Sequence, residues 1–501
     1  MHHAATGLTR HRTRHRSAAR ALLAARAARA AFALGLACVL AACGGGGNSN
    51  GVAPAAGCSV GELNSWLASY MDEWYFWRAA APRPAPDDTT PLATYFSALL
   101  YRGGVPTFTT DRWSYTETTA NFNRLFGDGQ SLGYGVSVAG LEVAGRPDQP
   151  LYVRYVEALS PATLAGVKRG DRVLSINGVA AGDVISRNDF SGLTASADGQ
   201  SLVLGLQQAS GTGTGAGAGT STGTGTSTGT STGTGTGTST VTLTSRAFNL
   251  TPVSQDTIVT TPGGRKLGYL VVKDMISQVN TPLDAAFGRF RAAGVQGVVL
   301  DLRYNGGGLV SVASNLSSYL AGPRAEGRVF TSLLYNDRRA ASNNTVYRFN
   351  NPAQAVNAPR VWVLAGARTC SASELVVNGL RGAGLEVVVI GDTSCGKPVG
   401  FLPTSQCGTT FNAVNFESVN DRGEGRYVDG LAPTCRVTED FTRPLGSNAE
   451  PLLAAALRHA DTGVCPAIAA GQAQALASPR NADGARPFAR DGGEFPGMLD
   501  R

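Results

Sequence analysis

The chain has 501 residues, a formal net charge of +7 and eight cysteines. This length predicts about three domains. Seven arginines and no acidic residue lie in residues 1–42, so removing them takes the net charge from +7 to about zero. The basic character belongs to that segment, and the rest of the chain gives no reason to expect nucleic-acid binding.

Residues 1–42 are typical of a secretory leader. The seven arginines precede an apolar run, Ala30 to Ala42, which is too short to span a bilayer. The run ends in Leu-Ala-Ala-Cys43 and resembles the lipobox of bacterial lipoproteins, in which the cysteine is lipid-modified. That resemblance implies an exported protein, anchored to the outer membrane through its lipid alone and facing the periplasm. The alternative is an ordinary signal peptide with Cys43 incidental.

Residues 43–57 are rich in Gly, Asn and Ser and suit a flexible tether. Residues 58–126 follow with a helical pattern. Its aromatic residues recur every three or four positions, which predicts one packed helix face on a small helical domain. They are Trp66, Tyr70, Trp74 and Trp77.

Residues 130–248 read as a β-rich unit. Leu151–Val156 is a predicted strand, and Ser160 to Gly178 predicts a short helix, a turn, a strand and an Asn-Gly turn. Residues 210–240 contain only small Gly, Thr, Ala and Ser side chains that cannot form a core, so we expect a flexible insertion. It interrupts two predicted partner strands, Leu202–Leu206 and Val241–Thr244.

Residues 251–465 contain three turns that could carry chemistry. The first follows the apolar strand Val298–Leu300 and reads Asp301-Leu-Arg-Tyr-Asn-Gly-Gly-Gly308, with a helical pattern after it. Bare backbone N–H groups at such a turn could bind a phosphate, but the Gly-Lys-Ser/Thr of a P-loop is missing. An oxyanion hole fits better.

The second turn lies between the apolar strand Arg360–Gly366 and an amphipathic helix. It reads Cys370-Ser371-Ala372-Ser373-Glu374 and places a hydroxyl at a helix start, where free N–H groups and the helix dipole stabilise an anion. Ser371 or Ser373 is therefore a candidate nucleophile.

The serine needs a base, and the sequence limits the choice. Four of the five histidines lie in the leader, which leaves His459, and we interpret His459 as a solvated residue at a helix end. Of four lysines, Lys397 follows a β-branched strand in the third turn, one strand–helix–strand unit beyond Ser371. Burial beside a serine favours loss of the lysine proton, so Lys397 is the preferred base. The alternative is a surface lysine.

With these turns in this order, the chain resembles the carboxyl-terminal processing protease (tail-specific protease) family of Ser/Lys peptidases. The resemblance implies Ser371 as nucleophile, with Ser373 second, and Lys397 as general base. It also implies an oxyanion hole of Ala372 with Gly306 or Gly307, with Glu374 in support. It implies no metal or organic cofactor.

The resemblance extends upstream and sets the expected fold. The Ala-Gly-x-x-x-Gly-Asp string within Ser160–Gly178 looks like the family's PDZ domain. Such a domain binds a peptide as an added strand and holds its carboxylate, for which Leu132-Gly133-Tyr134-Gly135 is the candidate loop. The alternative for these residues is an ordinary strand end that contains glycine. We therefore expect a multidomain α/β protein: a helical domain, a PDZ-like domain and a crotonase/Clp-protease-like catalytic domain.

Two positions depart from the family pattern. Many members carry a glutamine four residues after the lysine, where this chain has Phe401, and the residue before the nucleophile is Cys370. The missing glutamine keeps open an inactive, peptidase-like PDZ scaffold. An acyl-group enzyme is a second rival because the fold is related to that of crotonases, but export argues against coenzyme-A substrates.

Six cysteines remain beyond the leader and Cys43, an even set that suits an oxidising compartment. If Ser371 and Lys397 touch, Cys370 and Cys395 are neighbours, so we expect that disulfide, then Cys407–Cys435 and Cys58–Cys465. A zinc site built from these cysteines is less favoured than disulfides, because only one histidine lies beyond the leader.

Residues 466–501 show little periodicity and predict a disordered tail.

The sequence therefore predicts a lipoprotein endopeptidase that cleaves exported proteins near their C termini or in unfolded segments. Its expected partners are proteins or peptides with free C termini.

Overall fold

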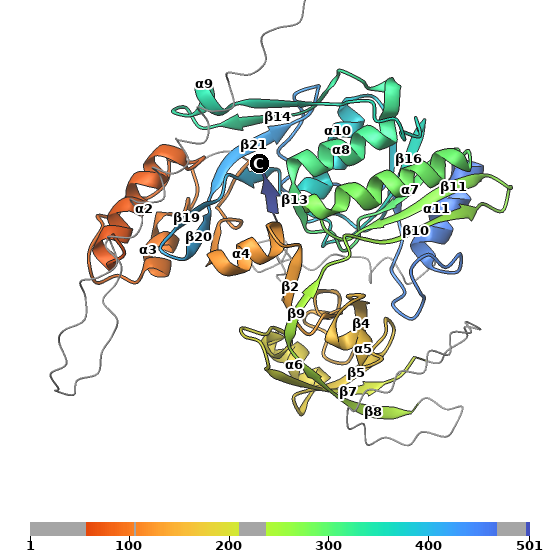
Figure 1. Cartoon of the computed structure of the whole chain (residues 1–501), viewed down its shortest axis with the longest axis horizontal. Coiled ribbons are helices and arrows are strands. Elements are labelled where there is room, and N and C mark those ends of the chain that lie inside the picture. The colour runs from red at the N-terminus through yellow and green to blue at the C-terminus, as the bar shows by residue number, and fades with distance from the viewer. Residues whose placement is uncertain (1–56, 105–106, 210–236, 468–496, 501) are drawn as a thin grey trace, which may run out of the picture. The chain divides into compact units, whose positions relative to one another are not determined.

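The computed structural model describes residues 57–104, 107–209, 237–467 and 497–500 (Figure 1). The expected leader, Cys43 and nearly all of the tether lie outside these residues. Within them, no helix has the length and apolarity needed to cross a membrane.

The N-terminal region is helical, as predicted. Its elements are α2 (Val60–Trp74), α3 (Leu92–Leu99), β1 (Tyr115–Thr118) and α4 (Thr119–Phe126). The aromatic row is not the most buried face of α2, because Leu67 and Met71 are buried whereas Trp66, Tyr70 and Trp74 are only partly so. Trp77 lies beyond the end of α2 and is buried in the same core cluster as Leu67 and Met71.

The next region is a β-rich unit with its own apolar core. Its sheet is antiparallel in the order β3-β4-β5-β7-β8, and β2 pairs with β9 beside it. The predicted hairpin is present, since Leu202 of β7 faces Leu243 of β8. Part of the expected insertion, Thr238–Thr240, belongs to β8, and residues 210–236 lie outside the described residues. The elements are β2 (Gln130–Gly133), β3 (Val136–Val138), η1 (Leu141–Val143), β4 (Leu151–Val156), α5 (Pro161–Leu164), β5 (Arg172–Ile176), β6 (Val179–Ala180), α6 (Ala181–Arg187), η2 (Ser191–Leu193), β7 (Ser201–Gln207), β8 (Thr238–Thr244) and β9 (Arg246–Asn249).

The third region, residues 251–465, contains a first sheet in the order β10-β11-β12-β16-β17-β22, parallel from β11 onward. Its strands alternate between two cores: Val361 and Val363 of β16 face the core that includes α10, whereas Trp362 and Leu364 face the core that includes α11. The elements are β10 (Val253–Thr260), β11 (Lys266–Val272), η3 (Ser277–Val279), α7 (Asn280–Ala292), β12 (Val298–Asp301), α8 (Val310–Ala321), β16 (Arg360–Ala365), α10 (Ala372–Gly382), β17 (Glu386–Gly391), β22 (Cys435–Arg436) and α11 (Pro451–Thr462).

A second sheet has the order β13-β23-β18-β21-β14-β15, and α10 packs against strands of both sheets. Its strand β23, drawn in dark blue beside β13 near the C terminus in Figure 1, comes from the tail that the sequence predicts to be disordered. That prediction is wrong for residues 497–499, because pairing with β13 and β18 supplies the order that local propensity lacks. The elements are β13 (Gly307–Leu309), η4 (Gly322–Arg324), β14 (Val329–Tyr335), α9 (Ala340–Asn343), β15 (Thr345–Arg348), β18 (Val399–Phe401), β19 (Thr404–Gln406), β20 (Thr409–Asn412), β21 (Val414–Val419) and β23 (Gly497–Leu499).

Three disulfides lie in the described residues. Cys370 pairs with Cys395, as expected, with Cα atoms 5.2 Å apart. The other two predicted pairs are wrong: Cys58 joins Cys407, and Cys435 joins Cys465. The reason is topological. The β19–β20 hairpin lies beside the helical region through its pairing with β1, and α11 packs on the sheet that contains β22.

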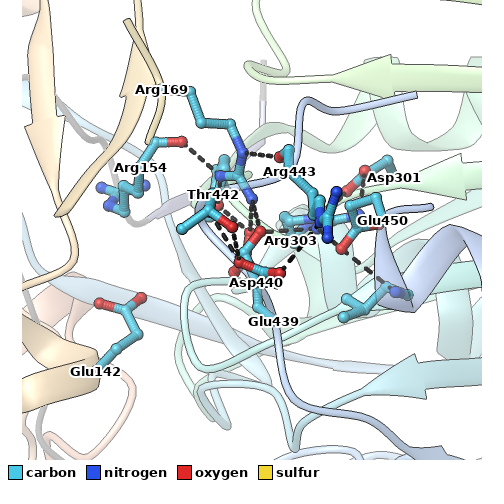
Figure 2. A network of polar contacts seen from close by, with 12 residues as sticks. Glu142, Arg154, Arg169, Asp301, Arg303, Glu439, Asp440, Thr442, Arg443 and Glu450 are labelled. Atoms are coloured by element: carbon cyan, nitrogen blue, oxygen red, sulfur yellow. Dashed lines mark hydrogen bonds and ion pairs between the residues drawn. The ribbon is translucent and has the colours of Figure 1, made fainter. Parts of the chain in front are cut away.

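A buried cation sits just after β12, where the glycine turn begins (Figure 2). The guanidinium of Arg303 is 2.9 Å from carboxylate oxygens of both Asp301 and Glu450, and 3.2 Å from Glu439. Burial alone would lower the pKa of Arg303, but these carboxylates raise it well above its usual value. Because Glu450 also caps α11, the cluster joins β12 to that helix.

Replacing this cation should be costly. We expect Arg303→Met to lower the free energy of unfolding by about 3–5 kcal/mol, because Asp301 and Glu450 would remain buried without it. Arg443→Met is the matched control: the Arg443 side chain is 53% exposed and 3.6 Å from Asp440, a surface pair worth at most about 1 kcal/mol. Urea unfolding measures both, and equal losses would contradict the prediction.

Candidate active site

The serine turn connects β16 to α10 and places Ser371 immediately before the helix. Its φ of 59° and ψ of −115° lie in a region that non-glycine residues rarely adopt, so the backbone is strained there. The Ser371 side chain is fully buried, and its Oγ has no hydrogen-bond partner among the described residues. The Ser373 hydroxyl, in contrast, donates to the Asn305 carbonyl at 3.0 Å. Ser371 therefore offers the uncommitted hydroxyl.

Glu374 joins the serine turn to the lysine turn. Its buried carboxylate accepts hydrogen bonds from the N–H groups of Ser371, Gly396 and Lys397, each at 2.8 Å, and from the Ser394 hydroxyl at 2.5 Å. Burial raises the pKa of Glu374, while the donors act in the opposite direction. The family resemblance implies a supporting role for Glu374. In the structure, its carboxylate links the backbone of the serine turn to the backbone of the lysine turn. Ser394, which sequence reasoning missed, precedes Lys397 by three residues.

Lys397 is fully buried beside an aromatic ring. Its Nζ lies 3.7 Å from the centroid of Phe401, the residue at the position of the family's glutamine. The sequence marks Phe401 only as a departure and gives no sign of this contact. A ring face attracts an ammonium group through its quadrupole, so Phe401 can stabilise the charged form of Lys397 while burial opposes it.

The glycine turn is held against the serine turn by Asn305. The Asn305 carbonyl accepts the Cys370 N–H at 3.1 Å as well as the Ser373 hydroxyl, and its side-chain amide donates to the Val272 carbonyl at 2.9 Å. Sequence reasoning did not single out Asn305, although it lies within the motif that identifies the turn. Through these contacts Asn305, which follows β12, holds the end of β11 next to the start of α10.

The oxyanion-hole candidates differ in how free their N–H groups are. Ala372 is the first residue of α10, so its N–H has no acceptor within the helix. Gly307 already donates its N–H to the Asn305 side chain at 2.8 Å. Gly306 precedes it and is partly exposed. Ala372 with Gly306 is therefore the better pair. Gly308 must be glycine, because its φ is +135° and a Cβ would lie 2.2 Å from the Met275 carbonyl oxygen.

The predicted peptide-binding residues line a pocket with a cavity volume of about 220 Å³. Leu132 and Gly133 end β2, and Tyr134 and Gly135 form the turn into β3. The pocket also has charged walls, which include Arg124, Glu157 and Lys273. Sequence reasoning did not find these charged residues, because they come from separate regions of the chain.

His459 is not the solvated helix-end residue that the sequence predicts. It is 6% exposed, and its Nδ1 accepts a hydrogen bond from the Trp362 indole at 3.2 Å. Burial lowers its pKa, and Trp362 faces the core on the opposite side of β16 from α10. His459 therefore does not face the serine turn.

In the part of the chain that the structure describes, two clusters are compact enough for a metal ion, Cys435–His459–Cys465 and Cys370–Glu374–Cys395. In each, the two sulfurs are joined in a disulfide and are not available as thiolate ligands.

The disulfide beside the dyad candidates should contribute to stability. Replacing Cys370 and Cys395 together by Ser opens a link between residues 25 apart, and we expect a loss of about 3 kcal/mol in the free energy of unfolding. Urea unfolding of the non-reduced protein measures it. A variant with Cys435 and Cys465 both replaced by Ser, 30 residues apart, is the control of matched loop length. An unchanged unfolding midpoint in the first variant would contradict the prediction.

Comparisons with known proteins agree with this architecture. Family models match Peptidase family S41 over residues 266–434, a PDZ domain over residues 152–208 and the Peptidase S41 N-terminal domain over residues 62–115. No curated protein sequence matches the chain. An S41 protease of known structure from Bacteroides fragilis is 25% identical, with a TM-score of 0.60 over 80% of this chain and 97% of that one.

A photosystem II D1 C-terminal processing protease is 19% identical, with a TM-score of 0.46 over 79% of this chain and 99% of that one. The family models and the Bacteroides structure cover the helical, PDZ and catalytic regions described above. The chain therefore carries an S41 N-terminal domain, a PDZ domain and a peptidase domain of family S41.

Proposed function

We propose that this S41 peptidase is a serine endopeptidase in which Ser371 is the nucleophile and Lys397 the general base. The observation that carries the proposal is the buried Ser371 hydroxyl, which has no hydrogen-bond partner among the described residues and lies at a strained helix start. The carboxylate of Glu374 binds the backbone of both residues and supports their pairing.

In this mechanism the neutral Lys397 amine accepts the Ser371 Oγ proton while Oγ attacks the carbonyl carbon of the scissile peptide bond. The N–H groups of Ala372 and Gly306 stabilise the oxyanion. The Lys397 ammonium, beside the face of Phe401, then protonates the leaving amine. Water hydrolyses the acyl-enzyme ester with Lys397 again as base, which restores the Ser371 hydroxyl.

The proposed substrates are exported proteins, cleaved near their C termini or in unfolded segments. The PDZ domain captures them at the pocket lined by Leu132–Gly135. Gly135 supports this assignment because its φ is +73° and a Cβ would lie 2.0 Å from the Ser160 Cβ, so a bare backbone is required there. Backbone N–H groups in such a turn can hold a carboxylate.

The protein is further proposed to be a lipoprotein attached through Cys43 and facing the periplasm. The arginine-rich leader and the Leu-Ala-Ala-Cys43 site support this, and disulfides in the described residues suit an oxidising compartment.

The dyad is tested by Ser371→Ala and Lys397→Ala in the processed full chain. We expect each variant to lose at least about a thousandfold in the rate of cleavage of an unfolded protein, because each residue performs a step that no neighbour replaces. Gel electrophoresis and mass spectrometry follow the cleavage, and circular dichroism confirms folding.

Ser373→Ala is the matched control. It removes a hydroxyl two residues away and one hydrogen bond to Asn305, so it should retain activity within about tenfold of the parent. Loss of cleavage in Ser373→Ala with activity kept in Ser371→Ala would reverse the assignment. A folded parent that cleaves nothing would favour the PDZ scaffold.

Lipid attachment is tested by expressing the full chain with its leader in a Gram-negative bacterium. We expect the parent in the membrane fraction, with an N terminus at a modified Cys43 in mass spectra. Cys43→Ser should leave the membrane fraction or keep its leader, because no thiol remains to be modified. A soluble parent with an unmodified N terminus would contradict the proposal.

A further inference from the structure

The last strand of the chain fills a gap between two strands of the second sheet. In the order β13-β23-β18, neither β13 nor β18 pairs with the other, and β23 pairs with both in parallel. Met498 lies opposite Gly308, and Leu499 lies opposite both Leu309 and Phe401. The Asp500 N–H continues the pattern by donating to the Phe401 carbonyl at 3.1 Å.

Both flanking strands belong to the candidate active site. β13 continues directly from the glycine turn, and β18 begins two residues after Lys397 and ends at Phe401, whose ring lies against the Lys397 amine. Helix α10, which starts immediately after Ser371, also packs against β23. An extended chain in this gap therefore runs beside the oxyanion turn, the nucleophile helix and the base.

The gap has distinct places for side chains. Met498 and Leu499 are both 0% exposed, so each is enclosed by protein. The Asp500 carboxylate accepts hydrogen bonds from two hydroxyls, Tyr347 at 2.6 Å and Tyr335 at 2.8 Å. The site thus takes two apolar side chains followed by an acidic group.

We propose that the gap between β13 and β18 is the strand-addition site for substrate, and that the chain's own C-terminal strand is a resident occupant which substrate must displace. The inference rests on the proposed function and adds a substrate class: an extended segment with two adjacent apolar residues followed by a carboxylate. Main-chain pairing supplies affinity in such sites, and side-chain pockets supply selectivity. A tethered occupant competes at a high effective concentration, so it lowers activity until it leaves.

The competing interpretation is a structural strand that never leaves. It predicts that removing β23 lowers stability and activity together, whereas a displaceable occupant predicts higher activity on removal. The two can be separated by a chain that ends at Pro496, compared with the full chain.

Binding is measured first, in the Ser371→Ala background, so that catalysis is not needed. The probe is a fluorescein-labelled peptide with the sequence of residues 494–501, followed by anisotropy. We expect it to bind the chain ending at Pro496 at least tenfold more tightly than the chain that retains its own tail. A peptide with Asp in place of both Met498 and Leu499 should not bind. A folded truncated chain that fails to bind the probe overturns the proposal.

Cleavage is measured second, with Ser371 intact. We expect truncation to raise the rate of cleavage of an unfolded protein at least fivefold and the unlabelled peptide to reverse that gain. Tight peptide binding with no cleavage by any chain would uphold the site and refute the proposed peptidase activity, so the two failures are distinguishable.

A second variant guards against a truncated chain that does not fold. Asp500→Ala keeps every strand and removes only the two tyrosine contacts. We expect at least a threefold gain in probe binding and in cleavage relative to the full chain. Unchanged binding and cleavage in this variant would overturn the proposal.

Discussion

One buried carboxylate, that of Glu374, connects two turns that belong to different strand–helix units. Its donors are three backbone N–H groups and a hydroxyl, drawn from the turn before α10 and the turn after β17. A buried charge or acid without such partners would be costly, so the two turns stabilise the carboxylate as much as it stabilises them. The strained backbone at Ser371 can persist because the hydrogen bonds around it, including that from its N–H to Glu374, hold it in this conformation. The adjacent disulfide adds a covalent link between the same turns.

The glycine turn is held from the opposite side. Arg303 fixes its start against Asp301 and Glu450, and Asn305 fixes its middle against the serine turn. Between them, Tyr304 accepts a hydrogen bond from Arg169 of the PDZ domain at 2.5 Å, and the guanidinium of Arg154 lies 4.8 Å from its ring (Arg154 and Arg169 in Figure 2). The glycine turn is therefore bounded by groups from the peptidase domain and from the PDZ domain. The hydrogen bonds that Arg303 makes with Glu450, and those of Asn305 with Val272 and Ser373, are buried, and the bond from Arg169 to Tyr304 is partly buried.

Local signals in the sequence were enough to predict the serine turn, the lysine turn and the strands that lead to them. Apolar strands, glycines and a helix start are encoded within a few residues, and the Cys370–Cys395 pair follows from bringing two such turns together. Contacts set by distant packing were not predictable. The pairing of Cys58 with Cys407 depends on where the β19–β20 hairpin lies, and the burial of His459 depends on which face of α11 meets Trp362. Strand β23 is only three residues long, which is too short for a pattern in the sequence to indicate a strand. Only its pairing with β13 in the folded protein identifies it.

The link between Cys58 and Cys407 spans 349 positions and closes a covalent ring around the helical domain, the PDZ domain and much of the catalytic domain. A single cut anywhere inside that ring, including the Gly/Thr-rich stretch of residues 210–236, would break the backbone without releasing a fragment. Both pieces would stay joined through sulfur, and the molecular mass would change only by the water added. Nicking of this protein, by itself or by others, would therefore be invisible on a gel until a reductant is added.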